Sequence, residues 1–134
     1  MTKKIKILLL SLFAFVLLTL FNTADANSIN SISMDIFLDD EGNASVTEVW
    51  ECYATEGTEV YHPYYNLGNS KITDLTVSDD KEEYTTLSHW NTSGDLEDKA
   101  YKCGINKISD GVELCWGISE YGYHTYTAKY KISN

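Results

Sequence analysis

The stretch Ser31–Ala54, which reads SISMDIFLDDEGNASVTEVWECYA, predicts a β-hairpin on which the rest of the fold depends. Its central residues, Asp39–Gly42, suit a type I turn with Gly42 in the left-handed conformation. Alternation of apolar and other residues is typical of strands with one buried face. Here the apolar residues recur at even positions before and after the turn: Ile32, Met34, Ile36 and Leu38, then Ala44, Val46, Trp50, Cys52 and Ala54.

The turn also predicts the register of this hairpin. A one-residue slip would place the polar Thr47 opposite Ile36 and turn one strand's apolar residues to the wrong face. We therefore expect both strands to direct their even-numbered residues toward one core. The expected pairs are Leu38 with Ala44, Ile36 with Val46, and Ile32 with Trp50.

Six further stretches predict strands, at 60–65, 72–78, 84–90, 102–107, 112–118 and 123–132. Pro63 restricts the first of these to an edge or an irregular segment, because proline cannot donate a hydrogen bond. We expect odd-numbered residues of 72–78 and even-numbered residues of 123–132 to face inward. A short helix is expected at 95–100, with Asp95 as its N-cap. The sequence thus predicts an all-β fold, a single antiparallel β-sandwich-like domain of about eight strands over residues 27–134.

Residues 1–26 predict a signal peptide. Three lysines precede the apolar run 7–21, and Ala24-Asp25-Ala26 matches the small-x-small pattern of a cleavage site. We expect cleavage after Ala26 and export of the rest to the cell surface or the extracellular space. The alternative is an uncleaved anchor, because 5–21 is just long enough for a bilayer core that needs roughly 17–25 residues.

The charge of the exported part restricts its partners. Residues 27–134 contain seven Lys, no Arg and nineteen acidic residues, which gives a net charge of −12. Nucleic acid and anionic membrane surfaces would repel such a domain. The expected partner is therefore a protein or a glycan, and membrane association is expected only through an uncleaved anchor or a region that follows.

Three cysteines lie beyond the predicted cleavage point: Cys52, Cys103 and Cys115. An oxidising compartment permits one disulfide, and Cys103 and Cys115 flank a predicted hairpin whose turn contains Ser109-Asp110-Gly111. The expected register pairs Ile105 with Cys115, so a bridge to Cys103 requires a different loop or a shifted register. The alternative is three buried free thiols.

Aromatic residues supply the candidate binding surface. Clustered tyrosines provide amphipathic contact area for proteins, and aromatic rings also stack on sugars. The alternative is that these rings only close the open ends of the sandwich. The candidate residues are Tyr61, His62, Tyr64 and Tyr65, extended by Trp90, Tyr121 and Tyr123.

Candidate chemistry is sparse. Glu48 shares the even-numbered face of its strand with Val46 and Trp50, so its carboxylate is expected to be partly buried and to need hydrogen-bond partners. No two of the three histidines have a ligand-like spacing, and no catalytic residue, metal or cofactor is predicted. We expect a non-catalytic module. The alternatives are a carbohydrate-binding module and a small hydrolase that uses Glu48 or a Cys/His pair.

Three segments together resemble the N-terminal domain of the bacterial domain-of-unknown-function family 2207, a group of predicted membrane proteins. They are DEGNASVTEVW at 40–50, ITDLTV at 72–77 and TYTAKYKISN at 125–134. The resemblance covers about residues 29–134 and implies a signal peptide and an extracytoplasmic β-domain, followed in full-length relatives by transmembrane helices. It implies no catalytic residue. This sequence stops at Asn134, so the resemblance leaves open whether the domain is tethered or secreted.

Overall fold

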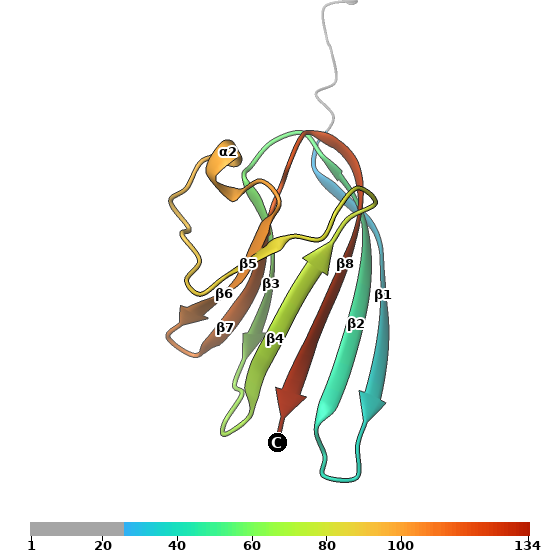
Figure 1. Cartoon of the computed structure of the whole chain (residues 1–134), viewed down its shortest axis with the longest axis vertical. Coiled ribbons are helices and arrows are strands. Elements are labelled where there is room, and N and C mark those ends of the chain that lie inside the picture. Colours follow the sequence, from blue (N-terminus) through green and yellow to red (C-terminus); the bar gives the residue numbers. More distant parts are fainter. Residues whose placement is uncertain (1–25) are drawn as a thin grey trace, which may run out of the picture.

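The computed structural model describes residues 26–134, which form eight strands in two sheets packed face to face (Figure 1). The predicted all-β sandwich is confirmed, whereas the predicted leader lies outside the described residues except for Ala26. One sheet has the order β1-β2-β8-β4, and the other has the order β3-β7-β6-β5. Their bounds are β1 Ser28–Leu38, β2 Ala44–Ala54, β8 Gly122–Ser133 and β4 Lys71–Ser78, then β3 Glu59–Tyr65, β7 Gly111–Gly117, β6 Lys102–Ile108 and β5 Thr85–Leu87.

One strand pair departs from the antiparallel pattern, because β5 runs parallel to β6. Parallel neighbours need a crossover connection, and here it contains the helix α2, Leu96–Lys99. The predicted N-cap is confirmed, since the Asp98 N–H donates to Asp95 Oδ1 at 2.8 Å. No helix within 26–134 is long and apolar enough to span a membrane.

The β1–β2 hairpin has the predicted register, with Leu38 opposite Ala44 and Ile32 opposite Trp50. The turn is also as predicted. Gly42 has a φ of 85°, and its N–H donates to the carbonyl of Asp39 at 3.1 Å. The Asp39 carboxylate accepts two further backbone N–H groups, which closes the turn.

The core lies where β2 and β8 face β7. Even-numbered residues of β2 and β8 point inward, as predicted, and meet Leu114 and Trp116 of the second sheet. The Trp116 ring makes edge contacts with Trp50 and Tyr126, at centroid distances of 5.4 and 5.9 Å. Such T-shaped contacts stabilise aromatic clusters beyond simple burial.

Strand β4 changes face part-way along its length. Asp74 has a φ of 58°, and the pairing with β8 shifts between Thr73 and Thr76. Ile72 is therefore buried before this bulge, and Leu75 and Val77 are buried after it. The expectation that odd-numbered residues face inward is correct after the bulge and wrong before it.

The β6–β7 hairpin corrects the predicted disulfide. Cys103 lies opposite Trp116 and Cys115 opposite Gly104. Neighbours along a strand point to opposite faces, so the two sulfur atoms lie on different faces of the sheet. All three cysteines are buried free thiols, which agrees with the alternative expectation.

Candidate functional site

Strand β1 lies at a sheet edge that the second sheet does not cover in the described part of the chain (Figure 1). Strand β3 packs over β2 and β8 instead, since the Tyr64 hydroxyl reaches Glu48 on β2 and Tyr130 on β8. All eleven residues of β1 are exposed. The expectation that both strands of the first hairpin face one core is therefore correct for β2 and wrong for β1.

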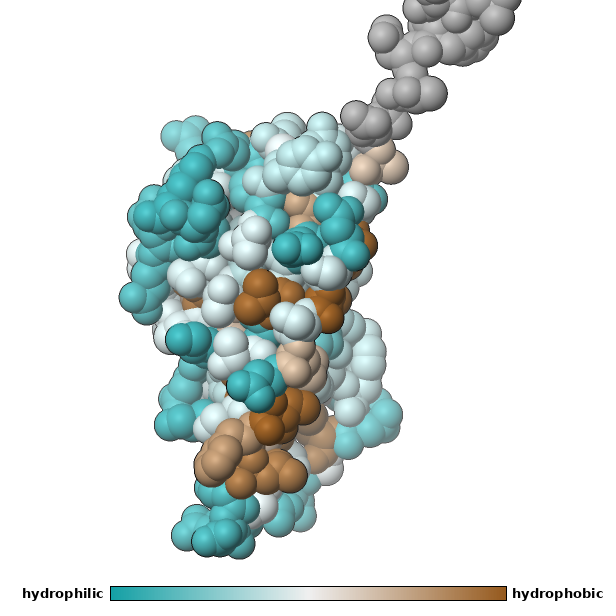
Figure 2. Space-filling model, turned by 90° about the vertical axis from the view of Figure 1, so that its right-hand side faces the viewer, coloured by the Kyte–Doolittle hydropathy of each residue, from teal (hydrophilic) through white to brown (hydrophobic). Residues whose placement is uncertain are grey.

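The uncovered residues of β1 form an apolar stripe. Ile32, Met34 and Ile36 have the core-facing parity, because they pair with Trp50, Glu48 and Val46, yet they remain 45%, 45% and 53% exposed. We call these three residues the β1 face. Figure 2 shows apolar groups gathered along this side of the molecule. Large exposed apolar patches mark binding surfaces or aggregation sites.

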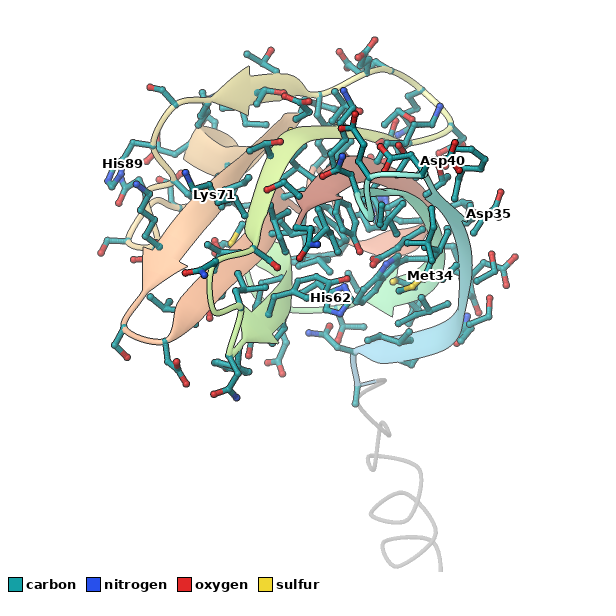
Figure 3. The ribbon with its side chains drawn as sticks, turned by 90° about the horizontal axis from the view of Figure 1, so that it is seen from below. Met34, Asp35, Asp40, His62, Lys71 and His89 are labelled. Carbon is teal, nitrogen blue, oxygen red and sulfur yellow. The ribbon has the colours of Figure 1, made fainter. Side chains whose placement is uncertain are left out.

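Figure 3 shows the two sides of β1. Met34 lies on the inner side of the ribbon, toward His62 of β3, whereas Asp35 lies on the outer side. The pairing of Met34 with Glu48 and the contact of Glu48 with His62 place these three residues in one region. The open side of the sandwich therefore lies between β1 and the edge strand β3, beside the covered inner face of β2.

An apolar cavity lies at one end of this open side. Its volume is about 400 Å³, and it extends between the start of β1 and the start of β3. The side chains that line it include Ile29, Trp50, Cys52, Val60, Tyr61 and Ile118. Trp50, which pairs with Ile32 of the β1 face, is one of its lining residues.

Glu48 lies on the inner face of β2, between the two sheets, and is fully buried. Its Oε2 accepts hydrogen bonds from Trp50 Nε1 at 2.7 Å and from His62 Nδ1 at 3.1 Å. Its Oε1 accepts from the hydroxyl of Tyr64 at 3.2 Å and from that of Tyr130. Four donors thus occupy the four acceptor positions of one carboxylate.

These contacts determine the titration of the cluster. Burial alone would raise the pKa of Glu48, but hydrogen bonds from His62, Tyr130 and Trp50 outweigh it and hold the pKa below its usual value. Burial and the adjacent carboxylate raise the pKa of Tyr130 well above its ordinary range. The carboxylate is therefore ionised at neutral pH, and the phenol is not.

Trp90 belongs to a second buried network, so its predicted role at a binding surface is wrong. It is 2% exposed, and its Nε1 donates to Glu59 Oε2 at 2.6 Å. The same oxygen binds Lys99 Nζ at 2.9 Å, and Lys99 also donates to Thr58 Oγ1 at 3.0 Å. This network holds the β5–β6 crossover against β3.

The other predicted binding residues do not form one surface. Tyr61 and Tyr65 are exposed on the odd-numbered side of β3, whereas His62 and Tyr64 turn inward to Glu48. The two remaining candidates, Tyr121 and Tyr123, lie near the β7–β8 turn. Tyr121 donates to the carbonyl of Gly57 at 3.1 Å, and Tyr123 contacts the ring of Tyr53 at 4.5 Å.

No group of three or more His, Cys, Asp or Glu side chains suited to a metal ion occurs among residues 26–134. His62 bonds Glu48, and the Nε2 atom of His124 contacts the carbonyl of Glu120 at 2.7 Å. His89 lies at the left edge of the molecule in Figure 3, away from His62 near its middle.

The strands around the open side carry one sign of charge. Residues 27–70, which include β1, β2 and β3, contain eight acidic residues and no Lys or Arg. Six of the acids are exposed, namely Asp35, Asp39, Asp40, Glu41, Glu51 and Glu56. The sequence analysis did not predict that the β1 face is exposed. Two features of the sequence indicate it: the uneven distribution of charge, and an apolar strand that has only one charged residue.

Comparison of the chain with protein-family models, with curated proteins and with solved structures finds no match.

Proposed function

We propose that residues 27–134 form an exported, non-catalytic module that binds another protein through the open side between β1 and β3. The observation that supports this most is the exposure of Ile32, Met34 and Ile36, whose parity directs them toward a core. Covering these side chains is favourable, because fully burying an exposed one contributes about 1.5–3 kcal/mol and these three are already about half buried. The predicted leader supports an extracellular or cell-surface location.

A photo-crosslinking amino acid at position 34, introduced into the exported protein in its native host, tests this proposal. We expect a discrete protein adduct from position 34 and none from the matched position 107, an exposed residue of β6. The adduct should disappear when Ile32 and Ile36 are replaced by Thr. Equal adducts from both positions would contradict the proposal, and a saccharide adduct would favour the carbohydrate-binding alternative.

A small hydrolase is the second candidate, because Glu48 and His62 lie 3.1 Å apart. A carboxylate beside an imidazole is a common arrangement for acid–base catalysis. Here, however, the carboxylate already accepts four hydrogen bonds and has no solvent exposure. A free acceptor position for a substrate proton would require one donor to leave, so the geometry favours a structural role.

We also propose that the chain corresponds to the N-terminal extracytoplasmic domain of family 2207. Its three quoted segments lie on the β1–β2 hairpin, on β4 and on β8, which are strands of one sheet. Under this assignment the module is the outer part of a longer, membrane-anchored protein. Genomic DNA that continues in frame beyond the codon for Asn134 and encodes apolar helices would support this assignment, and a stop codon there would contradict it.

A further inference from the structure

We infer that the molecule has a second binding site, for an anionic amphiphile: a single unbranched apolar chain that ends in a carboxylate or a phosphate. The site lies at β4, the edge of the first sheet opposite to β1, and faces β5 and β6 of the second sheet. It is separate from the open side, so this inference goes beyond the proposed function and does not rest on it.

A cavity of about 670 Å³, which we call the β4 cavity, lies between these strands. Small-molecule sites are typically clefts of roughly 300–1,000 Å³ with mostly apolar walls and a few polar groups. Two of the apolar side chains in this wall belong to the core, and three more pack against it. A bound apolar chain would therefore extend the core outward. The apolar side chains that line the cavity are Leu67, Ile72, Leu75, Leu87, Ile105 and Val112.

The bulge in β4 shapes one wall of the β4 cavity. Ile72 and Leu75 lie on either side of this bulge, and both side chains are buried. The strand thus presents two apolar residues to the cavity within a short segment. Thr86 Oγ1 of β5 donates to the carbonyl of Leu75 at 3.2 Å. This hydrogen bond joins the two sheets at the cavity and holds its apolar wall in place.

Two lysines without a side-chain partner line the β4 cavity. Within residues 26–134, four of the seven lysines contact an acidic side chain or a carbonyl. Of the other three, Lys71 and Lys107 line this cavity, and Lys129 does not. Figure 3 shows Lys71 in the left half of the molecule and Met34 in the right half. The cavity therefore offers two ammonium groups to an anion, at a distance from the β1 face.

Lys107 has an unusual position for a charged residue. Residues two apart along a strand lie on the same face, and Lys107 follows Cys103 and Ile105, which belong to the core or pack against it. Its partner on β7 is Val112, another residue of the cavity wall. Lys107 is nevertheless exposed. A lysine stem can lie along an apolar wall while its ammonium group stays in water, so this residue suits the boundary between a chain and its charged head.

The charge around the β4 cavity favours an anion. Asp74 is the acidic side chain in the wall, and its Oδ2 lies 3.1 Å from Lys131 Nζ, so its charge is already paired. The lysines that line the cavity are therefore not neutralised there, although residues 27–134 have a net charge of −12. This net charge disfavours an anionic bilayer. A single amphiphile presents one charge and one chain, which match the lysines and the apolar wall.

Calorimetric titration of the mature protein with dodecanoate, kept below its micelle concentration, tests the inference. Dodecyltrimethylammonium has the same chain and a positive head, and acetate has the head without the chain. The net charge of the protein favours the cation, so a preference for the anion must come from the site. We expect one dodecanoate per protein, bound at least fivefold more tightly than the cation, and no measurable binding of acetate.

Dodecyl phosphate separates the two head groups. Tighter binding than dodecanoate would assign the ligand to the lysophospholipid type, and weaker binding would assign it to the fatty-acid type. Both results support an anionic amphiphile.

Lysine variants test the position of the site. The double variant Lys71→Gln, Lys107→Gln removes both positive charges of the cavity, and Lys129→Gln removes an exposed lysine of β8 that lies outside it. We expect at least fivefold weaker dodecanoate binding for the double variant and less than a twofold change for the control. Val112→Phe adds volume to the wall and should weaken binding at least fivefold, with circular dichroism to verify that the variant is folded.

Ile36→Thr changes the β1 face and should alter dodecanoate binding less than twofold. Binding that is lost in Ile36→Thr and kept in the double lysine variant would place the chain at the open side and overturn the inference. Equal affinity for the cation and the anion would also overturn it, as would no binding at about 1 mM, the weak end of specific affinities. An amphiphile captured at position 107 is not a protein adduct, so these results remain distinct from the test of the proposed function.

Discussion

Glu48 is the residue whose environment is most unusual, a buried carboxylate with four hydrogen-bond donors. Its burial could be foreseen from its even position in the Ser31–Ala54 pattern. Its partners could not, because Tyr64 and Tyr130 are brought to it by the packing of two sheets. The hydrogen bonds of Glu48 join β2, β3 and β8. Removing this carboxylate is therefore expected to weaken the contact between the two sheets.

Replacing Glu48 by Gln is expected to lower the free energy of unfolding by about 2 kcal/mol at pH 7, because an amide leaves buried donors without a charged acceptor. The folded-state pKa of Glu48 is lowered, so its stabilising effect is present above its unfolded pKa and is lost as pH falls through the folded value. Urea unfolding should therefore show a smaller difference between the two proteins at pH 3. Glu51→Gln, an exposed control, should change stability by less than about 0.5 kcal/mol. Equal losses in both variants would contradict this account.

The three thiols give a second prediction at this scale. Burial, with Glu59 and Glu113 nearby, raises the pKa of Cys115 to about 12, and burial also raises the pKa values of Cys52 and Cys103. Because the thiolate is the reactive form, iodoacetamide at pH 8 should leave the native protein unmodified. In urea without reductant, mass spectrometry should show three adducts. One adduct before reduction and three after it would indicate a disulfide instead.

The hairpins show which features of the elements can be predicted. The β1–β2 register follows from local turn chemistry, with Asp39 and Gly42 in their expected roles. In β6–β7 the turn has two residues, because Gly111 already pairs with Ile108. The expected turn was one residue longer, and this single residue shifts Cys115 to the other face. The β4 bulge at Asp74 is likewise invisible to a period-two pattern.

The β5–β6 crossover depends on a glycine. A Cβ atom at Gly117 would lie 1.9 Å from the carbonyl oxygen of Lys99. Gly117→Ala is therefore expected to lower the free energy of unfolding by at least about 2 kcal/mol, because backbone must move. At Gly57 nothing lies within 4 Å of such a Cβ, so Gly57→Ala should cost only about 1 kcal/mol through its φ of 86°. Denaturant unfolding measures both, and an equal or smaller loss for Gly117→Ala would contradict the packing described.

At the scale of the whole molecule, the sandwich was predictable from alternation and turn spacing. The uncovered β1 was not, because no local pattern states which strands of two sheets lie opposite each other. The same pattern that predicts a buried face is found in β2, which is covered, and in β1, which is not.

Export is a prediction about the whole chain. If the leader is cleaved as the pattern Ala24-Asp25-Ala26 indicates, the exported protein begins at Asn27. Intact-mass measurement of protein recovered from outside the cytoplasm should give the mass of residues 27–134. A mass that still includes 1–21 would support the uncleaved anchor.

Met34 offers the most direct test of the open side, because it is the only methionine beyond Met1 and lies on the β1 face. Its ε-methyl group should give one resolved NMR signal in the mature protein. In the free monomer we predict strong relaxation of this signal by a soluble gadolinium chelate, because Met34 is 45% exposed. A Met34 methyl that is already as protected in the free monomer as the methyls of buried Val77 would show that β1 is covered and contradict the account.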